Sequence, residues 1–439
     1  MTTLNQSGVG EVAIEARTIR KLKMRILPFI WLLYIVAFLD RINIGFAALT
    51  MNRELAITGQ QFGLLTGIFF IGYFLFEIPS NLLLHRIGAR IWIARILITW
   101  GVVAALTGFA QSVHQLYFVR FLLGLAEAGF APGMLLYLTY WFREREQAQA
   151  VGLYLSGMPV ASLLGAPISG IILDHVHWFG LSSWRWLLIL EGVPAIACGL
   201  LTYFFLPSRP EEAKFLAADE KVWIRTELAR EEKQKLQQRQ YSALQAVTSG
   251  RVWCLVSIYF GMLIGLYTLN FWAPQFVKSL SGGYSNSAVG YLVMIPSVMG
   301  LAGMVFASRS SDRSLERRYH VAILATMAGV GLLLLGTTRS PLFSVALLSL
   351  VAIGAYGFMG PFWALPSEFL TGVSAATGLA LINSVGNLAG FVGPYAIGAI
   401  SEITGSLYAG LALAGASMLV SATLVLLLPT RAHAKRDLP

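Results

Sequence analysis

Twelve long apolar stretches run through the 439-residue chain and limit what it can fold into. They lie near residues 26–49, 61–84, 91–111, 114–140, 148–173, 184–206, 252–277, 286–307, 319–336, 341–364, 377–400 and 405–428. A helix needs about 20 apolar residues to cross a bilayer, and most of these stretches are long enough. Their apolar residues are continuous and do not alternate, which argues against a membrane β-barrel. The sequence therefore predicts an all-α membrane protein with twelve transmembrane helices.

The composition excludes several other classes of protein. Charged residues make up only 12% of the chain, against about 25% in ordinary soluble proteins. A soluble enzyme and a disordered chain are therefore excluded. The only two cysteines, Cys198 and Cys254, lie inside apolar stretches, so no disulfide framework is indicated. The net charge of +10 in so apolar a chain indicates a membrane surface and not nucleic acid.

Lysine and arginine are distributed unevenly between the two sides of the predicted bundle. With both termini in the cytoplasm, 26 of the 32 basic residues lie in the termini and loops of the inner side, and four lie in outer loops. Cytoplasmic loops of membrane proteins carry such an excess. We therefore expect both termini to be cytoplasmic. The expected location is a cell membrane, specifically a bacterial inner membrane.

One long polar segment divides the chain into two parts. We expect an N-terminal six-helix half at 1–206, a cytoplasmic linker with a surface helix at 207–250, and a C-terminal six-helix half at 251–439. The fifth and eleventh stretches carry similar Gly-Pro patterns, around Pro167 and Pro394. Small residues at such places let helices approach closely. The repetition indicates that the two halves are related by duplication.

Six charged residues fall inside the predicted membrane helices, all in the first half. They are Asp40, Arg41, Glu77, Arg120, Glu127 and Glu191. Each costs at least about 2.5 kcal/mol at membrane depth, so each is a functional candidate. Glu77 lies near a helix end and Glu191 lies beside tryptophans, and for both a structural role is favoured. For the other four, a functional site is favoured over a purely structural network of ion pairs.

The rise of a helix predicts how four of these groups meet. At about 1.5 Å per residue, Asp40 and Arg120 lie at the same level, so Asp40 is expected to pair with Arg120 and stay ionised. Glu127 lies two turns deeper on the same face and is expected to be away from the arginines and free to exchange protons. Asp40 and Arg41 project about 100° apart, so they face different partners. The set predicts a cavity in which arginines bind an anion and two acids carry protons.

The second half offers uncharged polar candidates, which include Asn383 and Trp363. Amides and aromatic rings in a cavity can recognise hydroxyl groups or a ring, although singly they more often hold helices together. His175 and His177 lack further ligands, and the chain has no phosphate-binding loop or zinc motif. We therefore expect no metal, no cofactor and no ATP-driven pump.

Three sequence strings resemble those of a known family. They are Phe38-Leu-Asp40-Arg41-Ile-Asn43-Ile-Gly45, then Gly72-Tyr73 with Glu77-Ile-Pro79-Ser-Asn81, and Arg120-Phe-Leu-Leu-Gly124-Leu-Ala-Glu127-Ala-Gly129. With them the chain resembles the major facilitator superfamily and, within it, the anion:cation symporter family. Its carboxylate permeases, such as tartrate, phthalate and hydroxyphenylacetate transporters, are the most similar. The resemblance covers essentially the whole chain.

The resemblance implies the major facilitator fold, in which two six-helix halves give access to a central site from alternate sides, driven by protons. It implies that Arg41 binds the substrate carboxylate and that Tyr73, Trp363 and Asn383 line the site. Asp40 and Glu127 would be the proton-coupling acids, with Arg120 as their partner beside the substrate. The loop after the second helix usually has an acid where this chain has His85, so the usual acid-arginine latch is expected only in the other half, at Asp312-Arg313.

The functional hypothesis is proton-coupled uptake of a small organic anion, such as tartrate, a sugar acid or an aromatic carboxylate. The expected partners are that anion, protons and the lipid bilayer, and the chain is expected to act as a monomer without nucleic acid. A proton-coupled exporter of drugs or metabolites is the main alternative. A channel needs no coupling acids, and a membrane sensor usually carries a signalling domain that 207–250 is too short to supply. Enzyme activity is not expected.

Overall fold

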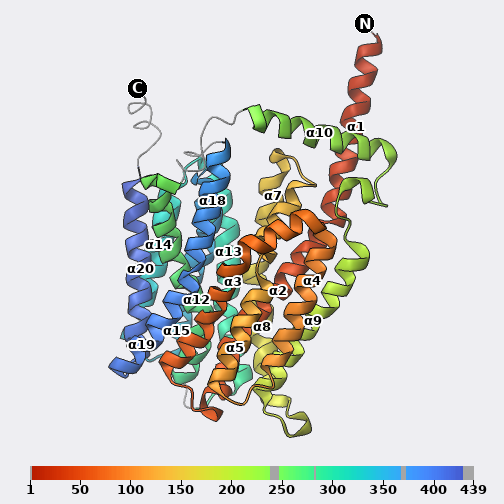
Figure 1. Cartoon of the computed structure of the whole chain (residues 1–439). Helices are drawn as coiled ribbons and strands as arrows, with labels where there is room; N and C mark the ends of the chain where they lie inside the picture. Colours follow the sequence, from red (N-terminus) through yellow and green to blue (C-terminus); the bar gives the residue numbers. More distant parts are fainter. Residues whose placement is uncertain (1, 238–246, 281–282, 367–371, 429–439) are drawn as a thin grey trace.

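The computed structural model describes residues 2–237, 247–280, 283–366 and 372–428, and its regular elements in these ranges are all helices (Figure 1). The first group is α1 (Thr2–Arg25), α2 (Leu27–Glu54), α3 (Gly59–Ile87), α4 (Ala89–Thr107), α5 (Val113–Glu127), α6 (Phe130–Thr139), α7 (Glu144–Leu155), α8 (Gly157–His175) and α9 (Ser183–Phe205). After α10 (Ala218–Gln237) follow α12 (Gly250–Leu280), α13 (Asn286–Ser314), α14 (Arg318–Leu334), α15 (Pro341–Gly357), α16 (Met359–Ala364), α18 (Gly372–Asn387), α19 (Ala389–Thr404) and α20 (Leu407–Leu427). Short 3-10 turns lie at Trp178–Gly180, Pro210–Glu212 and Leu335–Thr337.

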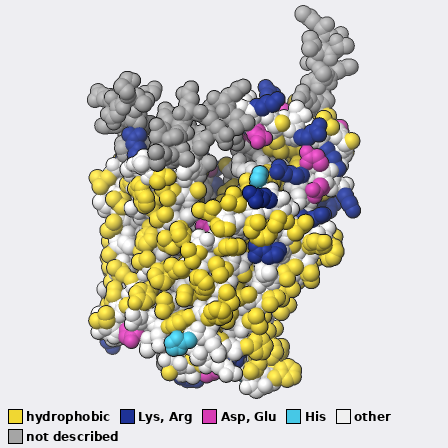
Figure 2. Space-filling model, viewed as in Figure 1, with side chains coloured by type: hydrophobic (Ala, Val, Ile, Leu, Met, Phe, Trp, Pro, Cys, Tyr) yellow, Lys and Arg dark blue, Asp and Glu magenta, His cyan; other side chains and the backbone are white. Residues whose placement is uncertain are grey.

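The helices correspond to the twelve apolar stretches. Eleven helical segments in the described residues are long and apolar enough to cross a membrane. The remaining predicted stretch, 377–400, is formed by α18 and α19 in succession. In Figure 2 a band of hydrophobic side chains covers the middle of the molecule, and most of the Lys, Arg, Asp and Glu side chains in view gather above it. The prediction of an all-α membrane protein with twelve spans is confirmed.

Several spans are interrupted where the sequence provides a local cause. The fourth span breaks between α5 and α6 at Gly129, whose φ of +83° is one that other L-residues rarely adopt. A Cβ at this glycine would also overlap the side chain of Ser80. The break ends α5 directly after Glu127. Glu127 therefore lies at the last turn of a helix in the middle of the span.

The polar helices α1 and α10 lie together at the end of the bundle where α2 begins and α20 finishes, which we call the terminal end (Figure 1). Arg17 and Lys21 of α1 both bind the carboxylate of Glu220 on α10, at 2.7 and 2.8 Å. Burial raises the pKa of Glu220, but hydrogen bonds from Lys21, the Ala217 backbone and Arg17 outweigh it and hold the pKa below its usual value. The N-terminal helix is thus docked onto the linker helix.

Polar contacts hold the loops that follow the second helix of each half. His85 Nδ1 lies 3.3 Å from the hydroxyl of Tyr140. In the other half, the carboxylate of Asp312 binds Arg317 at 2.7 Å, beyond the turn at Leu315. The latch expected at Asp312-Arg313 stays a prediction.

Close backbone contacts join the two halves at the end opposite the terminal end. Helix α3 packs against α19, α8 against α13, and α2 against α12. A Cβ at Gly63, near the start of α3, would overlap the carbonyl of Pro394, and one at Gly290, near the start of α13, would overlap that of Ala166. Backbones this close leave no passage between these pairs of helices. As far as the described residues show, the bundle is therefore closed at this opposite end.

Within the first half, α3 and α5 touch at Gly124, where a Cβ would overlap the carbonyl oxygen of Phe69. We expect Gly124→Leu to cost about 3 kcal/mol of stability, because the added side chain must push two helix backbones apart. The measurement is the melting temperature of the purified protein in detergent. The matched control is Gly152→Leu on α7, where a Cβ meets nothing within 4 Å. Equal melting temperatures for the two variants would contradict the close packing of α3 and α5.

Candidate functional site

A cavity of about 460 Å³ lies between the two halves, lined by helices of both. It reaches from Arg41, 14 residues into α2, toward the terminal end, where Leu135 and Gln147 line it. Arg41 and Glu77 are the charged side chains among its described lining residues. The volume suits a small organic molecule. Together with the closed opposite end, it makes this cavity the candidate site.

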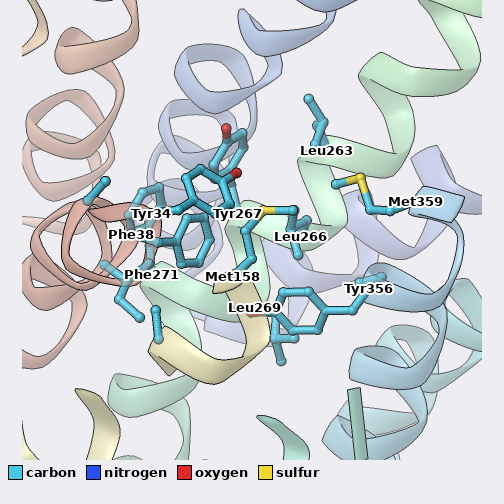
Figure 3. Close-up of a cluster of buried hydrophobic side chains, with 14 of the residues drawn as sticks. Tyr34, Phe38, Met158, Leu263, Leu266, Tyr267, Leu269, Phe271, Tyr356 and Met359 are labelled. Carbon is cyan, nitrogen blue, oxygen red and sulfur yellow. The ribbon is translucent and has the colours of Figure 1, made fainter. Parts of the chain in front are cut away.

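Most of the cavity wall is aromatic and aliphatic. Figure 3 shows Tyr34 and Phe38 of α2 facing Leu263 and Leu266 of α12, with Met359 beyond them. The ring of Tyr34 stacks on that of Tyr154 with centroids 4.0 Å apart. Such rings recognise flat apolar surfaces, and their hydroxyls provide a few polar contacts. An occupant is thus held between apolar walls and oriented by a small number of polar groups.

Arg41 is the cation of this cavity. Its side chain is 12% exposed, and a terminal nitrogen forms an ion pair with the fully buried carboxylate of Glu127 on α5. The guanidinium lies 5.3 Å from the ring centroid of Phe69 and 5.5 Å from that of Tyr73. Its Nε has no hydrogen-bond partner. Arg41 therefore presents unused donor capacity in a place of low dielectric constant, where an anion would be bound strongly.

Arg120 lies behind this wall and does not line the cavity. It is 2% exposed, and its guanidinium lies 5.9 Å from the ring of Phe69. Phe69 therefore contacts both arginines, and the negative face of an aromatic ring stabilises a cation. Arg120 also lies within electrostatic range of Asp40 and Glu127. Phe69 went unnoticed in the sequence because nothing marks one phenylalanine in an apolar stretch.

Asp40 was expected to pair with Arg120, but the two side chains form no ion pair. Its carboxylate accepts hydrogen bonds from the indole of Trp100 on α4 at 2.5 Å and from the amide of Asn43 at 3.2 Å. Among the described residues no ion pair joins it to a cation. Asp40 lies within electrostatic range of Arg120, but its side chain points from α2 toward Trp100 of α4, within the first half. Asp40 is 1% exposed and does not reach the cavity.

The expectation that Glu127 lies away from the arginines was also wrong. Asp40 and Arg41 point in different directions from α2, and it is Arg41 that faces α5 and takes Glu127 as its partner. The second carboxylate oxygen of Glu127 has no hydrogen-bond partner. The buried acid is therefore held by one ion pair, and it lies directly behind the cation of the cavity.

Of the other predicted site residues, Tyr73, Trp363 and Asn383 all line the cavity. Trp363 packs edge-on against Tyr259 with centroids 5.0 Å apart. Asn383 on α18 donates a hydrogen bond of 3.1 Å to Glu77 on α3, across the interface between the halves. The C-terminal half thus supplies uncharged polar and aromatic groups to the described wall of the cavity.

Glu77 belongs to the cavity wall, although its sequence position favoured a structural role near the membrane surface. It is 4% exposed, and each of its oxygens accepts a hydrogen bond from the other half, from Asn383 and from Ser384 at 3.2 Å. The signal that could have identified it is spacing, because Glu77 follows Tyr73 by four residues and so shares its helix face. Glu191, by contrast, lies outside the cavity and accepts a hydrogen bond of 2.9 Å from Ser169.

Comparison with known proteins agrees with this geometry. The model of the Major Facilitator Superfamily matches residues 30–394. A protein of Agrobacterium vitis named "Putative tartrate transporter" is 45% identical over 94% of this chain and 95% of its own. A protein of Acinetobacter baumannii named "Quinolone resistance transporter" is 40% identical over 90% of this chain and 91% of its own.

A solved structure of the xylose transporter XylE from E. coli, in a partially occluded inward open conformation, has the same fold. Its TM-score is 0.73 at 16% identity, with 93% of this chain and 98% of that chain covered. The matches cover nearly the whole length of the chain. They are consistent with its twelve-span fold and with the cavity between its halves. The chain belongs to the Major Facilitator Superfamily and is a multi-pass secondary transporter of a small molecule, not an enzyme.

Proposed function

We propose that the protein takes up a small organic anion, a carboxylate, together with protons. The observation that carries this proposal is the ion pair that Arg41, at the end of the cavity farthest from the terminal end, forms with Glu127. The planar fork of arginine fits the two oxygens of a carboxylate, and the relative named a tartrate transporter supports that substrate class. Tyr73, Trp363 and Asn383 would contact the rest of the substrate, and Arg120 would hold the acids behind Arg41.

Coupling follows from the competition for one guanidinium. An incoming carboxylate and the carboxylate of Glu127 both need Arg41, and two unneutralised anions beside one cation are costly in a low dielectric. A proton on Glu127 removes this conflict and frees Arg41 for the substrate. When Arg41 releases the substrate, Glu127 loses the proton and pairs with Arg41 again. Proton and anion therefore bind together and leave together.

The membrane potential sets how many protons are needed. Moving one negative charge inward against about 100 mV costs about 2.3 kcal/mol. One proton for each anionic charge cancels this cost, and accumulation driven by voltage needs at least one more. Asp40, held by Trp100 and Asn43 and within range of Arg120, is the second acid that we propose for proton coupling.

Export of drugs or metabolites is the second candidate function. It is favoured by the aromatic walls of the cavity and by the relative named a quinolone resistance transporter. The two functions differ in the direction of coupling. In proteoliposomes with a proton gradient directed inward, an importer concentrates labelled substrate inside, whereas an exporter exchanges it outward for protons.

For the carboxylate site, we expect Arg41→Lys to weaken binding of tartrate by about 10- to 100-fold, because lysine keeps the charge and loses the two-pronged contact. The measurement is isothermal titration of the purified protein. Arg95→Lys is the matched control, since Arg95 stacks on Trp92 outside the cavity and its exchange should leave affinity unchanged. Near wild-type affinity in Arg41→Lys would place the carboxylate elsewhere.

For proton coupling, we expect Glu127→Gln to abolish accumulation driven by a pH gradient while exchange without a gradient survives, because glutamine cannot carry the proton. The measurement is labelled-tartrate uptake into proteoliposomes with an imposed gradient, beside counterflow without one. Glu402→Gln, an exposed acid at the opposite end, is the control. Should Glu127→Gln still concentrate substrate as the gradient rises, the proton travels on another group, and Asp40 is tested next.

We also propose that the terminal end faces the cytoplasm of a bacterial inner membrane, as the positions of the basic residues indicate. We expect Gln234→Cys on α10 to react with an impermeant maleimide only from the cytoplasmic side, and Gln111→Cys at the opposite end only from outside. Both are made in a background without Cys198 and Cys254, and labelling is compared in right-side-out and inverted vesicles. Labelling of Gln234→Cys from outside would overturn this orientation.

A further inference from the structure

The contacts of Glu77 form a hydrogen-bonded chain with one direction. The hydroxyl of Tyr267 donates to Asn387 at 3.2 Å, Asn387 donates to Asn383 at 3.2 Å, and Asn383 donates to Glu77 at 3.1 Å. Every donor in this chain points toward the carboxylate, and Ser384 donates to its other oxygen. Such an arrangement is the one expected around an ionised acceptor. Glu77 is thus an acceptor-only group in the cavity wall.

A charge at this position is not needed to hold the helices together. A glutamine at the same place could accept the hydrogen bond from Asn383. Its burial would also cost less free energy than burial of a carboxylate. Glu77 also has no ion-pair partner among the described residues, since Arg41 is occupied by Glu127. A carboxylate has about four acceptor positions, and the described residues occupy two of them. Negative charge and acceptor capacity therefore remain available to an occupant of the cavity.

Arg41 and Glu77 lie at two levels of the same cavity. The guanidinium of Arg41 is 5.5 Å from the centroid of the Tyr73 ring. Glu77 is four residues, about 6 Å, further along the same face of α3. A short-chain acid bound by its carboxylate to Arg41 extends past Tyr73 toward Glu77. Its far end would then meet a negative acceptor flanked by the amide and hydroxyl of Asn383 and Ser384.

We propose that Glu77 determines substrate specificity by contacting the far end of the substrate, opposite the substrate carboxylate that Arg41 binds. It accepts hydrogen bonds from a hydroxyl, amide or ammonium group there and repels a second carboxylate. The substrate class is therefore a carboxylate with one negative charge and a hydrogen-bond donor at its far end, and a dicarboxylic acid enters in its singly charged form. This inference rests on the proposed function, because it takes Arg41 as the anchor of the first carboxylate.

The size of the discrimination follows from Coulomb's law. Two negative charges about 6 Å apart at an effective dielectric constant of about 20 repel strongly enough to lower affinity by about 100-fold. Screening by water in the open cavity reduces this effect. We expect a preference of about 10- to 100-fold for a donor over a carboxylate at the far end.

The test compares two probes of the same length, L-tartrate and its monoamide, which carries a carboxamide in place of one carboxylate. Affinities are measured by isothermal titration of the full-length protein in detergent at pH 7.5, where tartrate is a dianion. We expect the wild type to prefer the monoamide by about tenfold or more. Glu77→Gln should remove this preference, mainly by improving tartrate binding, and Glu77→Asp should keep it.

Glu191→Gln is the matched control, because it removes a buried carboxylate from the same half without touching the cavity, and its preference should equal that of the wild type. If Glu77→Gln does not fold, Glu77→Ala carries the same expectation. An unchanged preference in Glu77→Gln or Glu77→Ala overturns this inference, while loss of binding of both probes in Arg41→Lys would still uphold the carboxylate site. Failure of the wild type to bind either probe overturns the proposed function and this inference with it.

Discussion

The pairing of Arg41 with Glu127 is the interaction on which the rest of the site depends. Both groups lie in the middle of a bundle that crosses a membrane, where an unpaired charge is very costly. Together they are tolerated, but the pair is incomplete, since Nε of the arginine and one oxygen of the acid lack partners. An incompletely satisfied pair is one that a third charged species can rearrange. This property fits the transport role that we propose for the pair.

The surrounding structure keeps that pair in place without completing it. The ring of Phe69 contacts both guanidinium groups and so reduces the cost of having two cations close together. The backbone contact at Gly124 brings α3 and its rings against α5, and the left-handed turn at Gly129 ends α5 just after the acid. Asp40 is separately bound by Trp100, so it does not compete for Arg41. Each of these features is a small residue or an aromatic ring at a specific place.

The sequence was sufficient to predict the twelve spans, because hydrophobic length is a direct physical requirement of the bilayer. It also located the charged residues, since charges at membrane depth are rare and conspicuous. It failed on their pairing. Helical rise predicts the level of Asp40 and Arg41 but not which helix each side chain faces. That depends on where the fold places Trp100 of α4 and Glu127 of α5. The place of Glu77 in the cavity wall was not predicted for a related reason, because its partners, Asn383 and Ser384, lie about 300 residues away in the other half.

The two halves differ in one respect that bears on the electrical behaviour of the protein. Among the described residues, the charged groups at the cavity belong to α2, α3 and α5, whereas the described wall contributed by the second half is uncharged. In the alternating cycle that we propose, that described wall moves no formal charge of its own through the membrane field. The electric work done at the cavity is then done on the charged groups of the first half and on what they bind. Charge movement at the cavity of the empty protein would therefore report the motion and protonation of those groups.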